Sequence, residues 1–231
     1  MSTLLDALAN AFHLIASLDP DVIQYARRSV LIALVSTSAA SAVAIPVGVL
    51  VAEHDFHGKR LLVTVLNTLL GVPTVVVGLF VYSFISRSGP LGQLGLLFTV
   101  PGIIIGEILL ILPLATALTL MAVTRIDRDV RLTALALGAS DRQALWVVLQ
   151  ESRFGILAAV IAAYGRVVGE VGVATILGGN ADGFTRTLTT SIVLHVDMGN
   201  FELALALGIV LLAFSFAINV VFQLLQGRGR E

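Results

Sequence analysis

Five long apolar runs, separated by short polar stretches, make up most of this chain. The runs cover residues 29–52, 61–86, 96–123, 154–177 and 203–226. A helix of about 20 apolar residues is long enough to cross the hydrocarbon core of a bilayer. We therefore predict an all-α integral membrane protein with five transmembrane helices, each of which tolerates a few polar residues.

The first three runs contain internal prolines, among them Pro46, Pro73 and Pro113. Proline removes a backbone donor and clashes with the preceding turn, so we expect kinks in these three helices. The kinks at Pro73 and Pro113 either shape a pathway across the membrane or only bend packed helices. The sequence does not decide between these alternatives.

The chain before the first run is amphipathic. Its apolar residues recur every few positions and are Leu4, Leu8, Phe12 and Ile15. No basic residue precedes Arg27, whereas a secretory signal peptide has a basic start. We expect a helix on the membrane surface that ends at Asp19-Pro20, with a frayed terminus as the alternative. The chain then divides into an amphipathic segment, 1–21, a transmembrane domain, 22–227, and a tail, 228–231.

Basic residues are distributed unequally between the two sides that five crossings define. One side has Lys59, Arg60, Arg125, Arg128, Arg131, Arg142, Arg153, Arg228 and Arg230, and the other has Arg27, Arg28, Arg87 and Arg186. Cytoplasmic loops carry the excess of Lys and Arg. The nine-to-four distribution predicts a cytoplasmic C-terminus and an external N-terminus, although Arg27 and Arg28 run against the rule.

Composition supports a membrane protein and excludes other classes. Hydrophobic residues make up 57% of the chain and charged residues 13%, and the mean hydropathy is +0.98, which is too apolar for a soluble domain. A net charge of −1 leaves no basic face for a nucleic-acid backbone. Without cysteine, the chain has no disulfide and no thiolate metal site.

No catalytic, nucleotide or metal site is recognisable. A phosphate-binding loop needs G-x-x-x-x-G-K-[ST], but the only lysine, Lys59, has Glu53 in place of the first glycine and is followed by Arg60. The histidines form no convergent set; they are His13, His54, His57 and His195. We therefore expect that the chain is not an enzyme and carries no metal or cofactor of its own.

The longest polar stretch, residues 125–153, predicts two short helices joined at a glycine. Asp127 lies at the start of the first, where an acidic group complements the helix dipole, and Gly138 ends it. Ser140 and Gln143 form a capping-box pattern that starts the second helix. The apolar edge of such a pair either docks on a cytoplasmic partner or rests on lipid headgroups.

Within this stretch the chain reads Leu132-Thr133-Ala134, three further residues, and then Gly138-Ala139-Ser140. The spacing resembles the Glu-Ala-Ala loop motif of membrane-spanning subunits of binding-protein-dependent ABC importers of the type I fold. Leu132 replaces the glutamate of that motif. The resemblance implies an ATPase-docking loop that depends on apolar contacts more than on charge, formed by Leu132, Ala134, Leu135, Gly138, Ala139 and Ser140.

A second pattern comprises Tyr164-Gly165-Arg166, Gly169-Glu170, Gly178-Gly179-Asn180 and the threonine-rich segment 185–190. It is similar to permeases for tetrahedral oxyanions, namely molybdate, tungstate and sulfate. The run Gln150-Glu151-Ser152-Arg153-Phe154 looks most like tungstate permeases. Candidate pathway or gate residues are Glu107, Arg166, Glu170, Asn180 and Thr189. The hydroxyls and amides of residues 178–200 either meet a binding protein, line an outer gate or belong to a solvated loop.

Charged residues lie deep within two predicted spans. Arg166 and Glu170 are four apart on one predicted helix, and Glu107 lies in the third run at a similar depth. A charge at the bilayer centre costs about 3 kcal/mol unless it is paired or hydrated. We predict that Arg166 pairs with Glu170 or Glu107 and fixes two spans against each other. Direct contact between Arg166 and a passing anion is the alternative.

The resemblance implies an ATP-driven importer in a prokaryotic plasma (inner) membrane. It also implies that the chain forms a homodimer, that two ATP-binding subunits hold ATP and Mg²⁺, and that an extracytoplasmic solute-binding protein delivers the oxyanion. The Gly165 and Gly169 spacing suits either a helix interface in the homodimer or packing within one chain. The alternatives are a molybdate or sulfate importer, and an ion-coupled carrier in which Glu107 and Glu170 take up protons.

Overall fold

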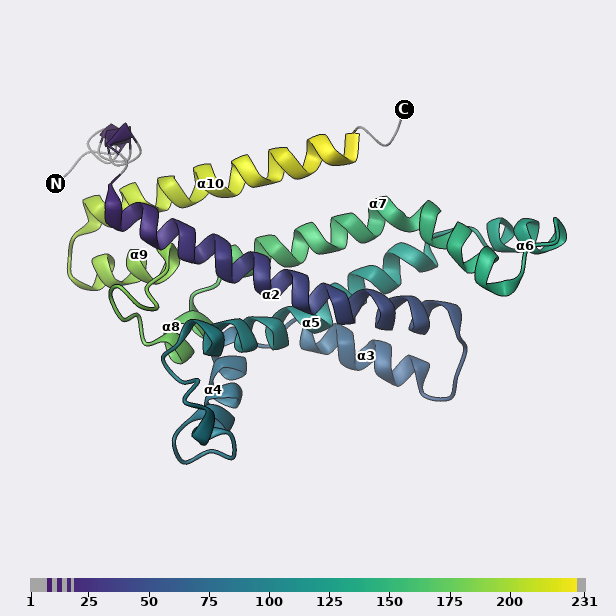
Figure 1. Ribbon diagram of the computed structural model, residues 1–231, viewed down its shortest axis with the longest axis horizontal. Helices are drawn as coiled ribbons and strands as arrows, with labels where there is room; N and C mark the ends of the chain where they lie inside the picture. The colour runs from purple at the N-terminus through teal and green to yellow at the C-terminus, as the bar shows by residue number, and fades with distance from the viewer. Residues whose placement is uncertain (1–7, 10–11, 14–15, 18, 228–231) are drawn as a thin grey trace.

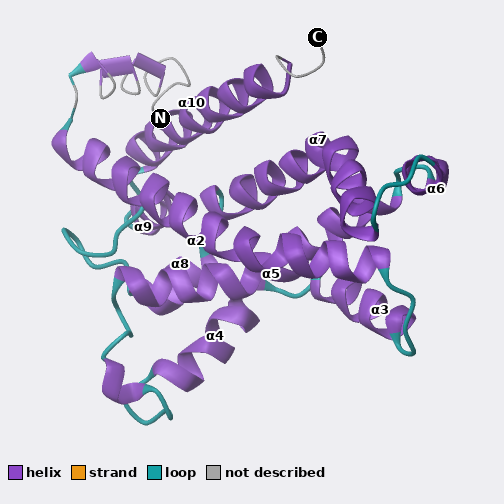
Figure 2. Cartoon of the chain, turned by 45° about the vertical axis from the view of Figure 1, so that its right-hand side comes forward, coloured by secondary structure: helices purple, strands orange, loops and turns teal. Residues whose placement is uncertain are grey.

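All regular structure in the computed structural model is helical over the residues it describes, 8–9, 12–13, 16–17 and 19–227 (Figures 1 and 2). The elements are α2 (Pro20–Glu53), α3 (Lys59–Leu69), α4 (Thr74–Ile85), the 3-10 turn η1 (Gly92–Leu94), α5 (Val100–Thr124), α6 (Arg128–Ala136), α7 (Asp141–Val168), α8 (Gly172–Gly178), α9 (Leu188–Asp197) and α10 (Phe201–Gly227). The predicted all-α class is confirmed.

The first long helix, α2, starts before the first apolar run. The Asp19 carboxylate accepts hydrogen bonds from two backbone N–H groups of the first turn, and Pro20 is the first helical residue. Both residues are favourable at a helix start. Asp19 is non-helical, so the helical structure breaks at Asp19-Pro20 as predicted, and the same two residues start α2. The predicted boundary between 1–21 and 22–227 falls inside α2. The rest of the amphipathic segment and the tail 228–231 lie mostly or wholly outside the described residues.

Among the described residues, four helices, α2, α5, α7 and α10, are long and apolar enough to cross a membrane. The second predicted span, residues 61–86, is not one straight helix, because α3 and α4 meet at an angle of 102°. Pro73 directly precedes α4 and has no N–H with which to continue α3, and Gly71 adds backbone freedom at the break. Pro46 and Pro113 instead lie inside the continuous helices α2 and α5. If the bent pair is one span, the chain has five.

The fourth predicted span, residues 154–177, is wrong at both ends. The helix that starts at Asp141 runs without interruption to Val168, so the second loop helix and the membrane span are one element, α7. The chain then breaks at Gly169, and α8 follows as a separate helix of seven residues. Hydropathy did not predict these helix ends, because it identifies the apolar part of a helix, whereas backbone hydrogen bonding determines where the helix begins and ends.

The core forms where α2 crosses α5. Small residues of α2, including Ala33, Ala40 and Ala44, are fully buried there. A Cβ on Gly48 of α2 would lie 2.8 Å from Cβ of Thr119 on α5, so only glycine fits at this crossing. Small residues allow helix backbones to approach closely in a membrane protein, where dispersion contacts replace much of the hydrophobic driving force.

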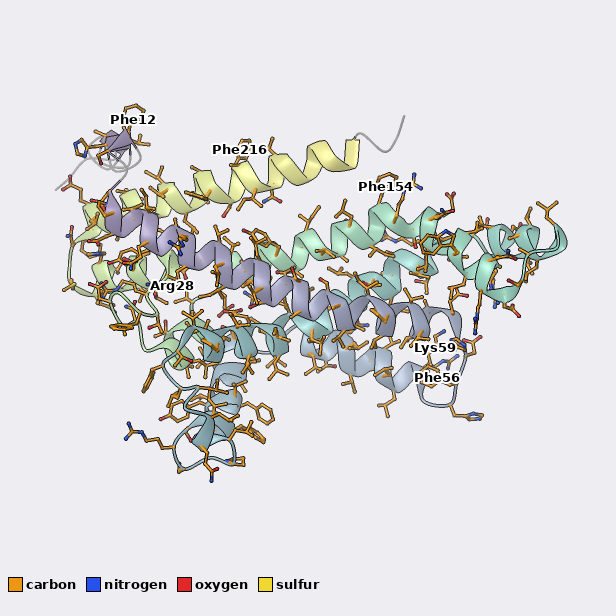
Figure 3. All side chains as sticks on the ribbon, in the orientation of Figure 1. Phe12, Arg28, Phe56, Lys59, Phe154 and Phe216 are labelled. Carbon is orange, nitrogen blue, oxygen red and sulfur yellow. The ribbon has the colours of Figure 1, made fainter. Side chains whose placement is uncertain are left out.

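The helices give the molecule two distinct ends along its long axis (Figure 1). One end carries α6 and the loop between α2 and α3, and the opposite end carries α9 and the start of α2. α2 runs between the two ends, and Figure 3 shows Arg28 and Lys59 at opposite ends of the molecule. This arrangement separates the polar loop from the candidate residues that follow α7.

Candidate functional site

Arg166 and Glu170 form an ion pair at the break between α7 and α8. The Arg166 Nη1 donates to Glu170 Oε2 at 2.9 Å. The other carboxylate oxygen, Oε1, accepts from the backbone N–H groups of Gly172 and Val173 at 2.9 and 3.3 Å. The predicted pair is confirmed, but Glu170 lies beyond the end of α7 and not on its face. The carboxylate thus connects the last turn of α7 to the first turn of α8.

The two partners differ in exposure. The Glu170 side chain is 2% exposed, whereas the Arg166 side chain is 43% exposed. On the same helix, Gly165 is exposed and no described residue lies within 4 Å of the position a Cβ would take. One face of α7 around Arg166 is therefore left uncovered by the described residues.

Glu107 of α5 is the third charged residue of this region and is only 1% exposed. It interacts electrostatically with Glu170 and Arg166, so the three groups lie near one another. Its Oε2 has no hydrogen-bond partner among the described residues, and the alternative pair between Arg166 and Glu107 is not formed. The preceding residue, Gly106, packs closely on the α8 side chains of Leu177 and Val173.

The segment after α8 is only partly a solvated loop, since residues 181–184 are exposed while residues 185–191 are buried or partly buried. Its hydroxyl residues Thr185, Thr187, Thr189, Thr190 and Ser191 are all buried. Thr189 Oγ1 donates to the backbone oxygen of Glu170 at 2.8 Å, and Thr187 and Thr190 form a capping box at the start of α9. The Asn180 amide donates to Thr190 O and accepts from Arg186 Nε. The hydrogen-bonding groups of Asn180 and Thr189 thus hold the segment together.

The loop between α8 and α9, residues 179–187, is fastened to the first part of α2. The two Arg28 Nη atoms each donate at 2.7 Å to backbone oxygens, those of Arg186 and Gly183. The Tyr25 hydroxyl donates to Asp182 at 3.0 Å, and Arg186 forms an ion pair with the same carboxylate at 3.1 Å. We call this set of contacts the outer-loop latch.

The outer-loop latch also affects the protonation of Asp182, which lies in the loop 179–187 outside the membrane-spanning helices. The hydrogen bond from Tyr25 and the nearby charge of Arg186 lower the pKa of Asp182 below its ordinary value. One signal of this structure was present in the sequence, because Arg28 breaks the rule for the distribution of basic residues. Its partners, more than 150 positions away along the chain, were not predictable from local pattern.

At the opposite end, α6 and the first turns of α7 enclose a groove of about 1080 Å³. Three predicted docking residues line it: Ala134, Gly138 and Ala139. Leu137 and Trp146, which the sequence analysis did not select, also line it and are 84% and 61% exposed. Two large exposed apolar side chains thus lie beside the groove.

The remaining predicted docking residues lie elsewhere. Leu132 lines a separate cleft next to the end of α2, and Leu135 is partly buried and lines neither cavity. Ser140 caps α7 through the predicted capping box with Gln143. The single apolar edge expected from the sequence is therefore divided between two surfaces of α6.

Gly138 makes the turn between α6 and α7. Its φ is +91°, a conformation that disfavours residues with a side chain, and a Cβ there would meet nothing within 4 Å. The Ala139 N–H donates to the oxygen of Ala134, which satisfies the last turn of α6. The predicted role of Gly138 as the residue that ends the first loop helix is confirmed.

Comparison with known proteins places the chain in a family. Residues 44–231 match the model of the binding-protein-dependent transport system inner membrane component, and the chain belongs to that family. It is a multi-pass membrane permease and not an enzyme, and membership of the family implies an ATPase and a binding protein as partners.

Three relatives are similar over most of their length. A probable anion ABC transporter permease protein of Haloferax volcanii is 41% identical over 81% of this chain and 84% of its own. The tungstate uptake system permease proteins TupB of Peptoclostridium acidaminophilum and Campylobacter jejuni are 38% and 39% identical. The first TupB aligns over 98% of this chain and 99% of its own, and the second over 72% and 70%.

Proposed function

We propose that the chain is the membrane-spanning subunit of an ATP-driven importer of a tetrahedral oxyanion, with tungstate as the transported anion. The similarity to two tungstate uptake permeases, one of them over nearly the whole length of both chains, is the observation that carries the choice of anion. ATP and Mg²⁺ bind to the partner ATPase, and no cofactor binds to this chain.

The groove between α6 and α7 is the surface on which the ATPase docks. Its exposed Leu137 and Trp146 offer apolar contact area, and Gly138 holds the two helices at their angle. With this end in the cytoplasm, the outer-loop latch faces the binding protein, the N-terminus lies outside and the C-terminus inside. The excess of Lys and Arg on the α6 side supports this orientation.

Two copies of the chain form the transporter, each with one ATPase subunit. The uncovered face of α7 at Gly165 and Arg166 supports pairing of two permeases there, because no part of the same chain covers it among the described residues. Measurement of the mass of the purified complex in detergent tests this stoichiometry. A single permease per complex would contradict it.

Arg166 acts first as a structural partner of Glu170. The ion pair and the two backbone hydrogen bonds of Glu170 fix α8 against the end of α7. Glu107, Asn180 and Thr189 support the same region from α5, the α8–α9 loop and α9. A free arginine would retain a doubly charged anion, whereas a paired one lets it pass.

Uptake in proteoliposomes tests the function. The chain, its ATPase subunit and the loaded binding protein are reconstituted, and tungstate accumulation is followed with and without ATP. We expect uptake that requires ATP, survives a proton ionophore and is not competed by sulfate. Uptake that the ionophore abolishes would identify an ion-coupled carrier with Glu107 and Glu170 as protonating groups, and preference for molybdate or sulfate would correct the anion.

A further inference from the structure

Arg131 of α6 connects the ends of three helices. Its Nε lies 3.4 Å from Glu53 Oε2, at the last residue of α2, and its Nη2 donates to Asp141 Oδ1 at 2.9 Å, at the first residue of α7. The guanidinium therefore lies where α2 ends and α7 begins. No role was assigned to Arg131 from the sequence.

The two carboxylates that pair with Arg131 differ in burial. The Asp141 side chain is 84% exposed, whereas the Glu53 side chain is only 17% exposed. An exposed ion pair contributes little, but a mostly buried carboxylate that loses its partner is destabilised more strongly. The contact with Glu53 is an ion pair without a hydrogen bond, and its carboxylate is the less exposed of the two, so loss of Arg131 should affect Glu53 more than Asp141.

α6 packs mainly against α7 and much less against α2. Between α6 and the end of α2 lies a cleft of about 550 Å³ that Glu53, Arg131 and Leu132 line. Within the described part of the chain, the pair between Arg131 and Glu53 is the ionic contact that links α6 to α2. This pair is therefore a direct route by which α6 and α2 can act on each other.

The helix that receives this displacement is long and continuous. α2 has 34 residues, which corresponds to a length of about 50 Å. Its far end holds the outer-loop latch through Tyr25 and Arg28 (Figure 3). The ion pair and the latch thus lie at opposite ends of one helix that runs the length of the molecule (Figure 1).

We propose that Arg131 is a positioning residue that transmits the movement of α6 to α2, and through α2 to the loop 179–187. The inference rests on the proposed function, in which an ATPase moves α6. The docking groove is not involved, because neither Arg131 nor Glu53 lines it. Loss of the pair should separate ATP hydrolysis from transport without preventing assembly.

The test compares Arg131→Met, Glu53→Gln and the double variant with the matched control Arg128→Met, a basic residue of the same helix without an ion pair in the described structure. Each is assembled with the ATPase subunit, and three quantities are measured: the bound ATPase, the rate of ATP hydrolysis and the tungstate imported per ATP hydrolysed. The third quantity reports coupling, which a purely structural role leaves unchanged.

We expect both single variants to bind the ATPase and hydrolyse ATP as the wild type does, while import per ATP falls about fivefold or more. The double variant should be no worse than either single one, because both remove the same contact. Arg128→Met should keep the wild-type ratio.

Wild-type import per ATP in Glu53→Gln overturns the inference, even if Arg131→Met does not assemble, because Glu53 tests the contact from the α2 side. A fall of the same size in Arg128→Met also overturns it, since charge on α6 would then be the cause. If the wild-type complex shows no ATP-dependent import of any oxyanion, the proposed function itself fails, which is a different result.

Discussion

The pair of Arg166 and Glu170 gives the sharpest test of the region between α7 and α8. Arg166→Met keeps most of the side-chain volume and removes the charge, so Glu170 remains 2% exposed without its ionic partner. Removal of one partner of a fully buried pair costs about 3–5 kcal/mol. Here Arg166 is 43% exposed and two backbone N–H groups remain on Glu170. We therefore expect a loss of about 1–3 kcal/mol, between the values for buried and exposed pairs.

The assay is unfolding of the purified protein in mixed micelles, together with tungstate uptake. Glu170→Gln should lose stability to a similar extent, and the double variant should lose less than the sum of the two, because the two groups are in contact. Arg87→Met, an exposed arginine without an ion pair in the described structure, serves as the control.

Two outcomes would refute the reasoning in different ways. Wild-type stability and uptake in Arg166→Met would show that neither the pair nor an anion contact matters. Wild-type stability with lost uptake, restored by Arg166→Lys, would instead identify Arg166 as a group that touches the anion.

Three further predictions concern other parts of the fold. Gly138→Glu should abolish ATPase docking and transport but leave membrane insertion unchanged, as co-purification and uptake would show; Gly138→Ala tests the backbone alone and should cost about 1–2 kcal/mol. Gly48→Ala should destabilise the crossing of α2 and α5 by about 1–3 kcal/mol in micelle unfolding, whereas Gly208→Ala, with open space around it, should cost less. The contacts of Asp182 in the outer-loop latch should stabilise the loop fully above the ordinary aspartate pKa of about 3.9. This stabilisation should be lost as the pH falls through the lowered pKa of Asp182 in the folded protein. Hydrogen exchange of residues 179–187 measures the pH dependence, and Asp182→Asn should remove it.

Local features of this protein were predictable because neighbouring residues determine them. The capping box of Ser140 and Gln143 forms as expected, and Gly138 takes the positive φ that ends α6. The pair of Arg166 and Glu170 was predicted from its spacing of four residues, although the helix ends between them.

Other features depend on contacts that no local pattern contains. Leu137 and Trp146 line the same groove only because the chain turns at Gly138 between α6 and α7, and no local sequence pattern specifies the angle between those helices. Arg28 and Arg131 have partners on distant segments, so their charge was visible while their contacts were not.

The sharp bend between α3 and α4 affects whether the chain crosses the membrane an odd or an even number of times. In Figure 1, α2 and α5 both run from the end that carries α9 toward the end that carries α6, so the chain between them must return. The bent pair makes that return despite its angle of 102°. If the bent pair is one membrane passage, the number of passages among the described residues is odd. We then expect the first residue of α2 and the last residue of α10 on opposite faces of the bilayer.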